Sequence, residues 1–335
     1  MRLLCIVDHG DPPSLRLRLK DCLPYYSNAG IAATIISVRR SSLRDRFRIL
    51  QEAGRHDAVI LFRTTGFGPL ELKLLRRANP RIIFDFDDAL MFREQKFARP
   101  LRVEEFEKFA RTMRHCAAAV AGNDFLGSFA EACGVKTIVL PTPIDLTKYR
   151  LKESSNEIGG TVGWLGLSDG LPYVRQIQPA LRRLSDRFAN FKLKIISDKS
   201  LKLDGVRIDN ELWRAETEQE NLASFDVGIM PLSDSVWARG KCGYKILQYM
   251  GVGTAVVASD VGFNNQIITS GENGFLARSE DEWVRSIATL FEQPDLRRSM
   301  GRRGRDLVEQ KYSLDHFAKV YIDLLREVAQ PHNSA

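Results

Sequence analysis

No stretch of the 335-residue sequence is apolar for long enough to cross a bilayer. Runs such as Leu3–Val7 and Ala117–Ala121 are far shorter than the roughly 20 residues that a membrane-spanning helix needs. The first ten residues lack the small-residue cleavage site of a secretory signal and are more typical of a buried strand. These absences predict a protein that neither spans a membrane nor carries a cleaved signal.

Cysteines are few, and none belongs to a C-x-x-C pair. The five cysteines are Cys5, Cys22, Cys116, Cys133 and Cys242. An odd number without metal-binding spacing argues against a structural zinc site and predicts reduced thiols. We therefore expect a cytoplasmic protein.

Acidic residues are fewer than basic residues only in the first half of the chain. Residues 1–150 hold 25 Lys and Arg against 17 Asp and Glu, whereas the remainder holds 24 against 25. The excess lies in Arg16–Lys20, in Arg39–Arg48 and around Arg76. Most of these side chains are expected on solvated helix faces, but a basic face can also meet nucleic acid, anionic lipid or an anionic substrate.

Short apolar segments alternate with amphipathic stretches of helical length, and the sequence has no low-complexity tract or short-period repeat. The predicted strands are Leu3–Asp8, Ala33–Val38, Ala58–Phe62, Arg81–Phe86, Ala117–Ala121, Thr137–Leu140, Thr161–Leu165, Lys192–Ile196, Val227–Met230 and Ala255–Ala258. The predicted helices are Ser14–Asn28, Leu43–Ala53, Pro69–Ala78, Val103–His115, Phe125–Cys133, Pro172–Phe188, Glu218–Ser224, Gly243–Met250, Glu280–Phe291, Asp295–Tyr312 and Leu314–Val328. This alternation predicts an α/β protein with two parallel sheets, joined by the polar stretch Lys152–Gly160. Ligands of such sheets bind beyond the carboxyl ends of the strands.

The segment KCGYKILQYMGVGTAVVASDVG, from Lys241 to Gly262, joins a predicted helix to a wholly apolar strand. On a helical wheel one face holds Lys241, Lys245 and Gln248, and apolar residues occupy the other face. The strand ends at the loop Ser259–Gly262. Unpaired backbone N–H groups and lysines at a helix start, beside the carboxyl end of a strand, favour a diphosphate ligand. An ordinary surface helix would explain the wheel but not its place beside this loop.

This segment, together with SGENGFLA at Ser270–Ala277, resembles the donor-binding half of the glycosyltransferase group 1 family (family 4), which has the GT-B fold. Further resemblance lies in TVGWLG, FDVGIMPL, PPSLRLRL, RIIFDFDDAL, VAGNDFL and LPTPIDLTKY, and so covers nearly the whole chain. The resemblance implies two Rossmann-like domains with parallel sheets that face a central cleft. Residues 1–152 would bind the acceptor, residues 153–312 would bind a nucleotide-sugar donor, and residues 313–335 would cross back onto the N-terminal domain. It also implies transfer with retention of configuration and without a metal.

The chain departs from the family pattern at two positions. Many members carry a Glu-x7-Glu signature where this chain has Gly240 and Gln248. A carboxylate accepts strongly from two ribose hydroxyls, whereas an amide accepts more weakly and also donates. The candidates for ribose and nucleotide binding are Gln248, Tyr244 and Trp213.

The Arg/Lys pair that many members place on the donor phosphates is also not evident after Thr161–Gly166. The candidates for phosphate binding are Lys241, Lys245, Arg239 and Gly166. Lys245 is favoured among them, since its K-x-x-Q-Y spacing is the one that the resemblance shares.

The stretch RIIFDFDDAL, Arg81–Leu90, is open to several interpretations. Asp85-x-Asp87 resembles the metal-binding D-x-D of the other glycosyltransferase fold. It also resembles the opening of haloacid-dehalogenase phosphatases, whose first Asp is the nucleophile. That motif would require Gly and Thr in place of Asp88 and Ala89. Carboxylates that cap the next helix, or Asp87 and Asp88 as acceptor contacts, are the remaining interpretations.

The loop Asp8–Ser14 follows the first strand and is expected to reach the same cleft. Gly10 would let the backbone approach a ligand, and His9 and Arg16 are further candidates for the acceptor or catalytic side. A lone histidine is more often structural. Asn123, which follows a buried strand, is expected to cap the next helix rather than to bind a ligand.

The predicted function is a retaining, hexosyltransferase-type glycosyltransferase that moves a sugar from a UDP- or GDP-sugar to a hydroxyl of a glycan or lipid-linked acceptor, in cell-surface polysaccharide synthesis. Lysines and helix amides would stabilise the leaving phosphate, and no cofactor or metal is expected. We also expect peripheral contact with the anionic inner face of a membrane and no binding of nucleic acid. One alternative is a nucleotide-sugar 2-epimerase of the same fold, which would need acid/base carboxylates around the sugar. Another is a weakly active homologue that binds nucleotide or a polyanion.

Overall fold

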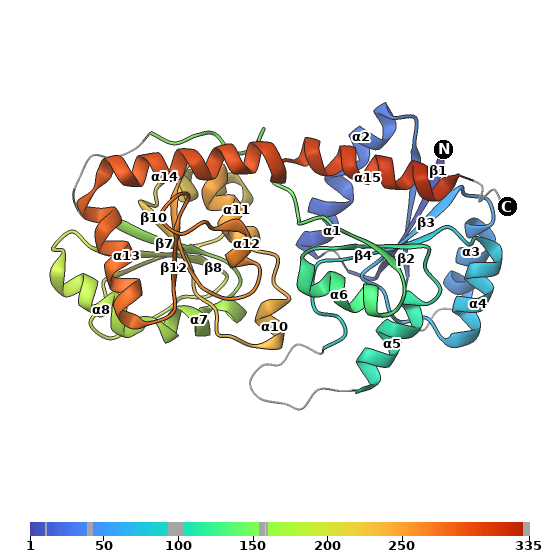
Figure 1. The fold of residues 1–335 in the computed structure, drawn as a ribbon, viewed down its shortest axis with the longest axis horizontal. Coiled ribbons are helices and arrows are strands. Elements are labelled where there is room, and N and C mark those ends of the chain that lie inside the picture. The colour runs from blue at the N-terminus through green and yellow to red at the C-terminus, as the bar shows by residue number, and fades with distance from the viewer. Residues whose placement is uncertain (11, 39–42, 93–102, 154–157, 159, 331–335) are drawn as a thin grey trace. The chain divides into compact units, whose positions relative to one another are not determined.

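The protein is built from two compact units. The computed structural model describes residues 1–10, 12–38, 43–92, 103–153, 158 and 160–330. The first unit comprises Met1–Pro143, Gly240–Cys242 and Leu314–Ala335, and the second comprises Ile144–Arg239 and Gly243–Ser313. Each unit contains one six-stranded parallel sheet with helices packed against it (Figure 1).

The sheet of the first unit has the strand order β2-β1-β3-β4-β5-β6. Its strands are β1 (Arg2–Asp8), β2 (Ala32–Val38), β3 (Ala58–Phe62), β4 (Ile82–Phe86), β5 (Ala118–Ala121) and β6 (Lys136–Val139). Every residue of β3, β4 and β5 is buried. Such strands are covered on both faces, because the crossover connections of a parallel sheet place helices on either side.

Seven helices of the first unit lie among the described residues. They are α1 (Pro13–Arg18), α2 (Leu23–Asn28), α3 (Leu43–Ala53), α4 (Pro69–Ala78), α5 (Val103–Met113), α6 (Asp124–Ala132) and α15 (Leu314–Ala329), with a 3₁₀ turn at Lys20–Cys22. Helix α15 contributes Phe317, Tyr321 and Leu325 to the same apolar core as β1, β3 and α1. The last helix of the chain is therefore part of the core of the first unit.

The sheet of the second unit has the strand order β12-β11-β10-β7-β8-β9. Its strands are β7 (Thr161–Leu165), β8 (Lys192–Ser197), β9 (Ile208–Leu212), β10 (Val227–Met230), β11 (Ala255–Ser259) and β12 (Phe275–Ala277). Alternate residues of β11 enter two separate cores: Val257 packs on one face, and Val256 and Ala258 on the other. This alternation follows from the two-residue period of a strand.

The described helices of the second unit pack on these two faces. They are α7 (Leu171–Gln176), α8 (Gln178–Arg187), α9 (Glu218–Ala223), α10 (Val236–Arg239), α11 (Tyr244–Gly251), α12 (Asn264–Ile267), α13 (Glu280–Glu292) and α14 (Pro294–Leu307), with a π-helical turn at Val308–Tyr312 and 3₁₀ turns at Ser168–Gly170 and Ala215–Thr217. Two strand glycines make room for aromatic rings. A β-carbon on Gly163 would overlap the ring of Phe225, and one on Gly228 would lie 2.5 Å from the ring of Tyr249. A glycine inside a strand commonly marks such a close approach.

The structure differs from the sequence-based prediction at identifiable points. The predicted helices Ser14–Asn28 and Pro172–Phe188 are each divided in two. In both cases a proline lies in the first turn of the second piece, Pro24 in α2 and Pro179 in α8. Proline is accepted there because it has no N–H to donate, whereas it disrupts a helix interior.

Two strands, β9 and β12, were not predicted. Strand β9 lies at the sheet edge and none of its residues is fully buried, so it lacks the apolar run of a central strand. Strand β12 has only three residues. Short or polar edge strands carry a weak pattern in the sequence.

Some sequence-based predictions fall outside the described residues, namely Arg39, Arg40, Asp11 and most of the interior of the proposed linker Lys152–Gly160. The five cysteines are free thiols. Across the described part of the chain, no helix has both the length and the apolarity to span a bilayer.

Candidate active site

Polar side chains gather at the carboxyl edge of the first sheet. Thr64 follows β3 and donates through Oγ1 to Oδ1 of Asp8, the last residue of β1, at 2.6 Å. Arg63 also follows β3, and Asp87 and Asp88 follow β4. Since β1, β3 and β4 are neighbours, the order of the strands brings these residues together.

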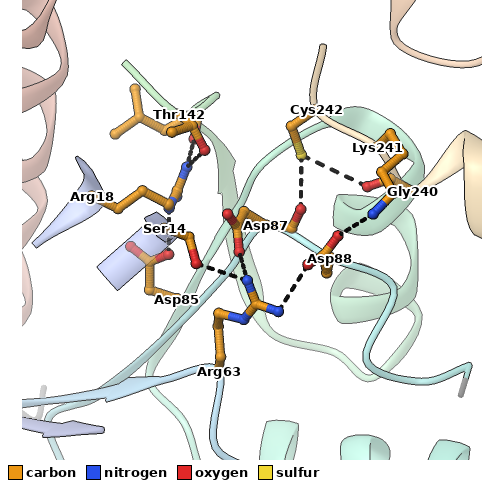
Figure 2. Close-up of polar contacts among 11 residues, drawn as sticks. Ser14, Arg18, Arg63, Asp85, Asp87, Asp88, Thr142, Gly240, Lys241 and Cys242 are labelled. Carbon is orange, nitrogen blue, oxygen red and sulfur yellow. Dashed lines mark hydrogen bonds and ion pairs between the residues drawn. The ribbon is translucent and has the colours of Figure 1, made fainter. Parts of the chain in front are cut away.

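Arg63 is the centre of this group, as Figure 2 shows. Its Nη1 donates to Ser14 Oγ at 2.7 Å and to Asp87 Oδ1 at 2.8 Å, and its Nη2 donates to Asp88 Oδ2 at 2.8 Å. Its backbone has φ 55°, and among the described residues it is the one non-glycine with a positive φ. Such a conformation is strained for a residue with a side chain and is found most often at functional sites.

The charges on the two aspartates are matched by cations. Burial raises the pKa of Asp87, and the guanidinium of Arg63 opposes that shift. Asp88 lies 3.1 Å from the ammonium of Lys241 as well as beside Arg63. We define the polar cluster as Ser14, Arg63, Asp87, Asp88 and Lys241.

A second ion pair lies deeper in the same unit. Arg18 is 1% exposed and donates through Nε to Asp85 at 2.8 Å and through Nη1 to the carbonyl of Leu140 at 2.8 Å. Burial raises the pKa of Asp85, while Arg18 favours its ionised form. The guanidinium also lies over the ring of Phe317 in α15. Asp85 is therefore a structural partner of α1 and α15.

The segment Gly240–Cys242 belongs to the first unit although its sequence neighbours belong to the second. Cys242 donates through Sγ to the carbonyl of Asp87 at 3.2 Å, and Asn123 donates through Nδ2 to the carbonyl of Lys241 at 3.0 Å. Gly122 leaves the space that Cys242 fills, because a β-carbon there would overlap its sulfur. The helix cap predicted for Asn123 is confirmed: its side chain accepts from the backbone N–H of Leu126 at 2.8 Å.

The three carboxylates of the Asp85–Asp88 stretch all lie in ion pairs. Asp85 pairs with Arg18, and Asp87 and Asp88 pair with Arg63, so each carboxylate faces a guanidinium. In the described contacts these carboxylates accept from cationic side chains, while residues 93–102, which precede the next helix, lie outside the described part of the chain, so the capping interpretation stays a prediction. Among the described residues, no three His, Cys, Asp or Glu side chains form a group that could hold a metal ion.

Three further candidates for the acceptor side, His9, Gly10 and Arg16, lie in the loop after β1 and on α1. His9 and Gly10 are exposed, and the backbone N–H of His9 donates to the carbonyl of Val38 at 3.0 Å. Arg16 is exposed on α1. None of the described contacts joins His9, Gly10 or Arg16 to Arg63.

The sequence-based prediction gave no role of their own to Arg18 and Ser14, and it did not name Arg63. Ser14 and Arg18 are both buried and four residues apart on α1, so the helical spacing that places Arg16 outside places Arg18 on the inner face. Arg63 could have been found by the strand-end rule that singled out Asp87, because it follows the apolar strand β3 directly.

In the second unit the predicted phosphate-binding helix does not include Lys241. Helix α11 starts at Tyr244, after Gly243 in the left-handed conformation with φ 64°. Lys241 therefore lies before the helix, and the wheel that placed it on one face with Lys245 and Gln248 is wrong. Gln248 is also buried, at 3% exposure. The apolar face of Ile246, Leu247 and Met250 is buried as predicted.

Lys245 and Gly166 lie together. Gly166 directly follows β7, and a β-carbon on it would overlap Cε of Lys245 and lie 3.0 Å from the ring of Trp164. The ammonium of Lys245 is 5.6 Å from the centroid of that ring. Lys245 lies in the first turn of α11, and its aliphatic stem passes over the backbone of Gly166 at the carboxyl end of β7.

Arg239 is held elsewhere. It is exposed on α10 and donates through Nε and Nη2 to the two carboxylate oxygens of Asp234 at 2.7 and 2.9 Å. Of the four phosphate candidates, Lys245 and Gly166 are in contact, Arg239 pairs with Asp234, and Lys241 pairs with Asp88.

Two of the three candidates for nucleoside binding, Gln248 and Trp213, contact a residue that was not predicted, Glu218 at the start of α9. Its carboxylate accepts from the phenol of Tyr149 at 2.5 Å, from the amide of Gln248 at 3.2 Å and from the indole of Trp213 at 2.7 Å. Burial, and then the neighbouring Tyr244 and Glu218, raise the pKa of Tyr149, so its phenol stays protonated and donates. No apolar periodicity or motif marks Glu218, because its role depends on chain segments far apart in sequence.

Comparison with known proteins bears on both units. Residues 160–293 match the family model described as glycosyl transferases group 1. The chain is similar to the Anabaena protein Alr3699/HepE solved with UDP and glucose, with TM-score 0.71 and 16% identity over 98% of this chain and 100% of that one. It is also similar to a glycosyltransferase from Rickettsia africae, with TM-score 0.75 and 14% identity over 99% of both chains. For sucrose-phosphate synthase from Thermosynechococcus elongatus, the TM-score is 0.71 and the identity 12% over 98% of both chains.

One curated relative matches a short region. Trehalose synthase from Pyrococcus horikoshii is 27% identical over 86 residues, which are 26% of this chain and 21% of that protein. The chain therefore aligns with about a fifth of the length of this relative. The solved structures are matched over nearly their whole length, and at their level of identity they establish the fold. The predicted GT-B fold is confirmed, and so is the family resemblance over residues 160–293.

Proposed function

We propose that this chain, which has the GT-B fold and matches the group 1 glycosyltransferases over residues 160–293, transfers a sugar from a nucleotide-diphosphate sugar to an acceptor hydroxyl. The observation that carries the proposal is Lys245, which lies over Gly166 and Trp164 in the first turn of α11. A cation in the first turn of a helix, where the helix dipole is positive, at the carboxyl end of a parallel strand, suits a diphosphate.

The proposed donor is a UDP- or GDP-sugar that binds to the second unit. Alr3699/HepE has been solved with UDP, with UDP and glucose, and with UDP-glucose, which supports a uridine donor for a chain of the same fold. Trp213 is 41% exposed, follows the end of β9 and offers an indole face on which a base could stack. These features favour the carboxyl edge of the second sheet for the nucleotide.

The proposed chemistry is transfer of a hexosyl group with retention of configuration. The acceptor oxygen forms a bond to the anomeric carbon as the bond from that carbon to the phosphate oxygen breaks, on the same face of the sugar. The acceptor proton passes to the leaving phosphate oxygen, so no protein nucleophile is needed. Lys245 and the amides at the start of α11 stabilise the charge that develops on the phosphate. The lysine and the amide dipoles take the role that a divalent metal has elsewhere, and we propose that no metal or other cofactor is required.

The proposed acceptor side is the polar cluster of the first unit. Arg63 has a strained backbone and holds Ser14, Asp87 and Asp88 in one place. A carboxylate such as Asp87 and a hydroxyl such as Ser14 are groups that bind sugar hydroxyls. The exposed loop with His9 and Gly10 adjoins the same edge of the sheet, because it follows β1.

A panel of UDP- and GDP-sugars, tested for hydrolysis and for transfer in the presence of EDTA, would test this function. We expect turnover of at least one donor, unaffected by EDTA, because the lysine and the helix amides supply the counter-charge. Loss of activity in EDTA that manganese restores would contradict the metal-independent part. Binding of nucleotide without turnover of any donor would favour a binding homologue, and release of the 2-epimer of the sugar would favour an epimerase.

A basic and apolar surface of the first unit supports an acceptor at a membrane. Helices α3 and α4 lie side by side and are tied by an ion pair between Arg46 and Glu71 (Figure 1). Three large apolar side chains are exposed on them, Phe47 at 73%, Leu70 at 68% and Leu74 at 43%. The exposed cations on the same two helices are Arg44, Arg48, Lys73, Arg76 and Arg77.

This combination of cations and apolar side chains is typical of a surface that rests on anionic lipid. The hollow lined by Arg44, Arg46, Arg48 and Phe47 has a volume of about 630 Å³. We therefore propose a cytoplasmic protein in peripheral contact with the inner face of a membrane, which acts on a lipid-linked acceptor in cell-surface glycan synthesis.

Neutralising Arg44 and Arg48 together as glutamines is expected to weaken binding to phosphatidylglycerol vesicles by roughly tenfold or more, because each cation near an anionic surface contributes about 1 kcal/mol. The measurement is vesicle co-sedimentation at low and at high salt, and high salt should reduce binding by the wild type. Arg285→Gln/Arg302→Gln, on exposed arginines of the second unit, removes the same charge and should bind like the wild type. Binding that is absent at low salt, or equal in both variants, would contradict membrane contact through α3 and α4.

A further inference from the structure

The carboxylate of Glu218 accepts hydrogen bonds from two of the predicted nucleoside-binding residues, Gln248 and Trp213, and from Tyr149. Oε1 accepts from Tyr149 and from Gln248, and Oε2 accepts from Trp213. Gln248 also donates to the Tyr149 hydroxyl at 3.2 Å. Three donors from three separate segments of the chain thus converge on a single acidic side chain.

These donors fix the orientation of the carboxylate. Gln248 and Tyr149 are 3% and 5% exposed, so the groups that hold Oε1 are themselves fixed by packing. The residues that follow Tyr149 and Glu218 in the chain also hydrogen-bond to each other. Gln219 accepts from the backbone N–H of Arg150 and donates to its carbonyl, both at 3.0 Å.

The carboxylate keeps room for one more donor. Two carboxylate oxygens offer about four acceptor sites, and three hydrogen bonds fill three of them. The remaining site is on Oε2, the oxygen that faces Trp213. Glu218 is half-buried and Trp213 is exposed, so this side of the carboxylate is the one that a ligand can reach.

The amide of Gln248 is already used. Both hydrogen bonds described for it run from Nε2 to Tyr149 and Glu218, and the side chain is buried. An amide in this position orients its neighbours, whereas a hydroxyl-rich ligand is bound most strongly by an ionised acceptor, because hydrogen bonds to charged groups are about twice as strong as neutral ones.

We propose that Glu218 is the group that accepts a ribose hydroxyl of the bound nucleotide, and that Gln248 and Tyr149 are positioning residues that aim its carboxylate. This inference rests on the proposed function, since it assigns a residue of the donor site. Glu218 thus replaces Gln248 as the residue proposed to contact the ribose directly. Glu218 also gives the site a specificity role, because its carboxylate distinguishes ribonucleotides from deoxyribonucleotides.

Calorimetry of the whole protein with UDP, 2′-deoxy-UDP and 3′-deoxy-UDP would test the inference, with GDP and 2′-deoxy-GDP as probes if the sugar panel identifies a guanosine donor. We expect the wild type to bind UDP roughly tenfold to a hundredfold more tightly than the weaker of the deoxy analogues, the loss for one hydrogen bond to a charged acceptor. In Glu218→Gln the discrimination should fall to roughly twofold, with near-normal affinity for the deoxy analogue. Glu220→Gln changes the same charge on an exposed position of α9 and should keep the wild-type ratio.

If the single variant folds poorly, the double variant Glu218→Gln/Gln248→Glu provides a second test of the same inference. It returns one carboxylate and one amide to the same cluster, so it should fold and should recover part of the discrimination. A wild-type ratio in Glu218→Gln would overturn the inference, and so would a wild type that binds UDP and both deoxy analogues equally. Failure of the wild type to bind UDP or GDP would instead contradict the proposed function.

Discussion

Replacing Arg18 with methionine is expected to lower the free energy of unfolding of the first unit by about 3–5 kcal/mol, since removal of one partner of a buried ion pair leaves the other charge uncompensated. Asp85, the partner, has a side chain that is 2% exposed and accepts the Nε–H of Arg18 at 2.8 Å. The same substitution removes the hydrogen bond to the Leu140 carbonyl and the contact with the Phe317 ring. Denaturant unfolding of the full chain, followed by a probe in the first unit, measures the loss.

The pH dependence of this loss has a definite sign. Burial already raises the pKa of Asp85, and loss of Arg18 removes the main group that opposes the shift. A carboxyl group whose pKa is higher in the folded than in the unfolded state contributes stability below its unfolded pKa, and that stability is lost as pH rises through the folded pKa. The deficit of Arg18→Met should therefore shrink as pH falls toward about 4, the unfolded pKa of aspartate.

Two controls accompany this prediction. Arg16→Met removes an exposed arginine from the same helix and should change stability by less than about 0.5 kcal/mol. Arg18→Met/Asp85→Leu removes both charges and should recover much of the loss, because apolar replacements of a buried pair are often nearly neutral. A single variant as stable as the wild type would show that this ion pair does not hold α1 and α15 to the sheet.

Replacing Lys245 with alanine is expected to weaken binding of UDP or GDP by roughly tenfold to a hundredfold and to leave binding of uridine or guanosine nearly unchanged. The reason is its place in the first turn of α11, over Gly166, where it would contact the diphosphate but not the nucleoside. Calorimetry with each nucleotide and its nucleoside measures the difference.

Lys199→Ala is the matched control for Lys245, because Lys199 is an exposed lysine of the same unit, and it should bind like the wild type. Equal losses for nucleotide and nucleoside in Lys245→Ala would reject a phosphate role and indicate a general disturbance of α11. Since the Lys245 stem packs beside Trp164, a thermal unfolding measurement should accompany the titration.

Much of the fold could be predicted from the sequence, because the signals involved are local. The fully buried strands β3, β4 and β11 consist of apolar residues except for Asp85 in β4 and Ser259 in β11, and their bounds match the prediction closely. Helix α11 was expected from its apolar face, which packs as predicted. The edge strand β9 was not expected, because its polar composition carries no such run.

The proposed donor site could be predicted only in part. Lys245 was singled out by its spacing in the sequence, and the structure shows it in contact with Gly166. Lys241 was assigned to the same helix face, but Gly243 adopts a left-handed conformation and the helix starts after it, so Lys241 reaches Asp88 of the first unit. A helical wheel assumes that the helix begins where the sequence pattern begins. That assumption fails here, because Gly243 has a positive φ and the helix starts only after it.

The sequence by itself determined the two α/β units, the order of most of their strands and helices along the chain, and the resemblance of Lys241–Gly262 to a donor-binding segment, since each of these depends on residues near one another in the chain. Only the tertiary structure decided which charges meet. Arg63 reaches Asp87 because β3 and β4 are neighbours in the sheet, and Glu218 meets Tyr149 and Gln248 because three distant segments pack together. Ion pairs and hydrogen bonds act over a few ångströms in space, and no periodicity in a single sequence records which distant residues will come within that range.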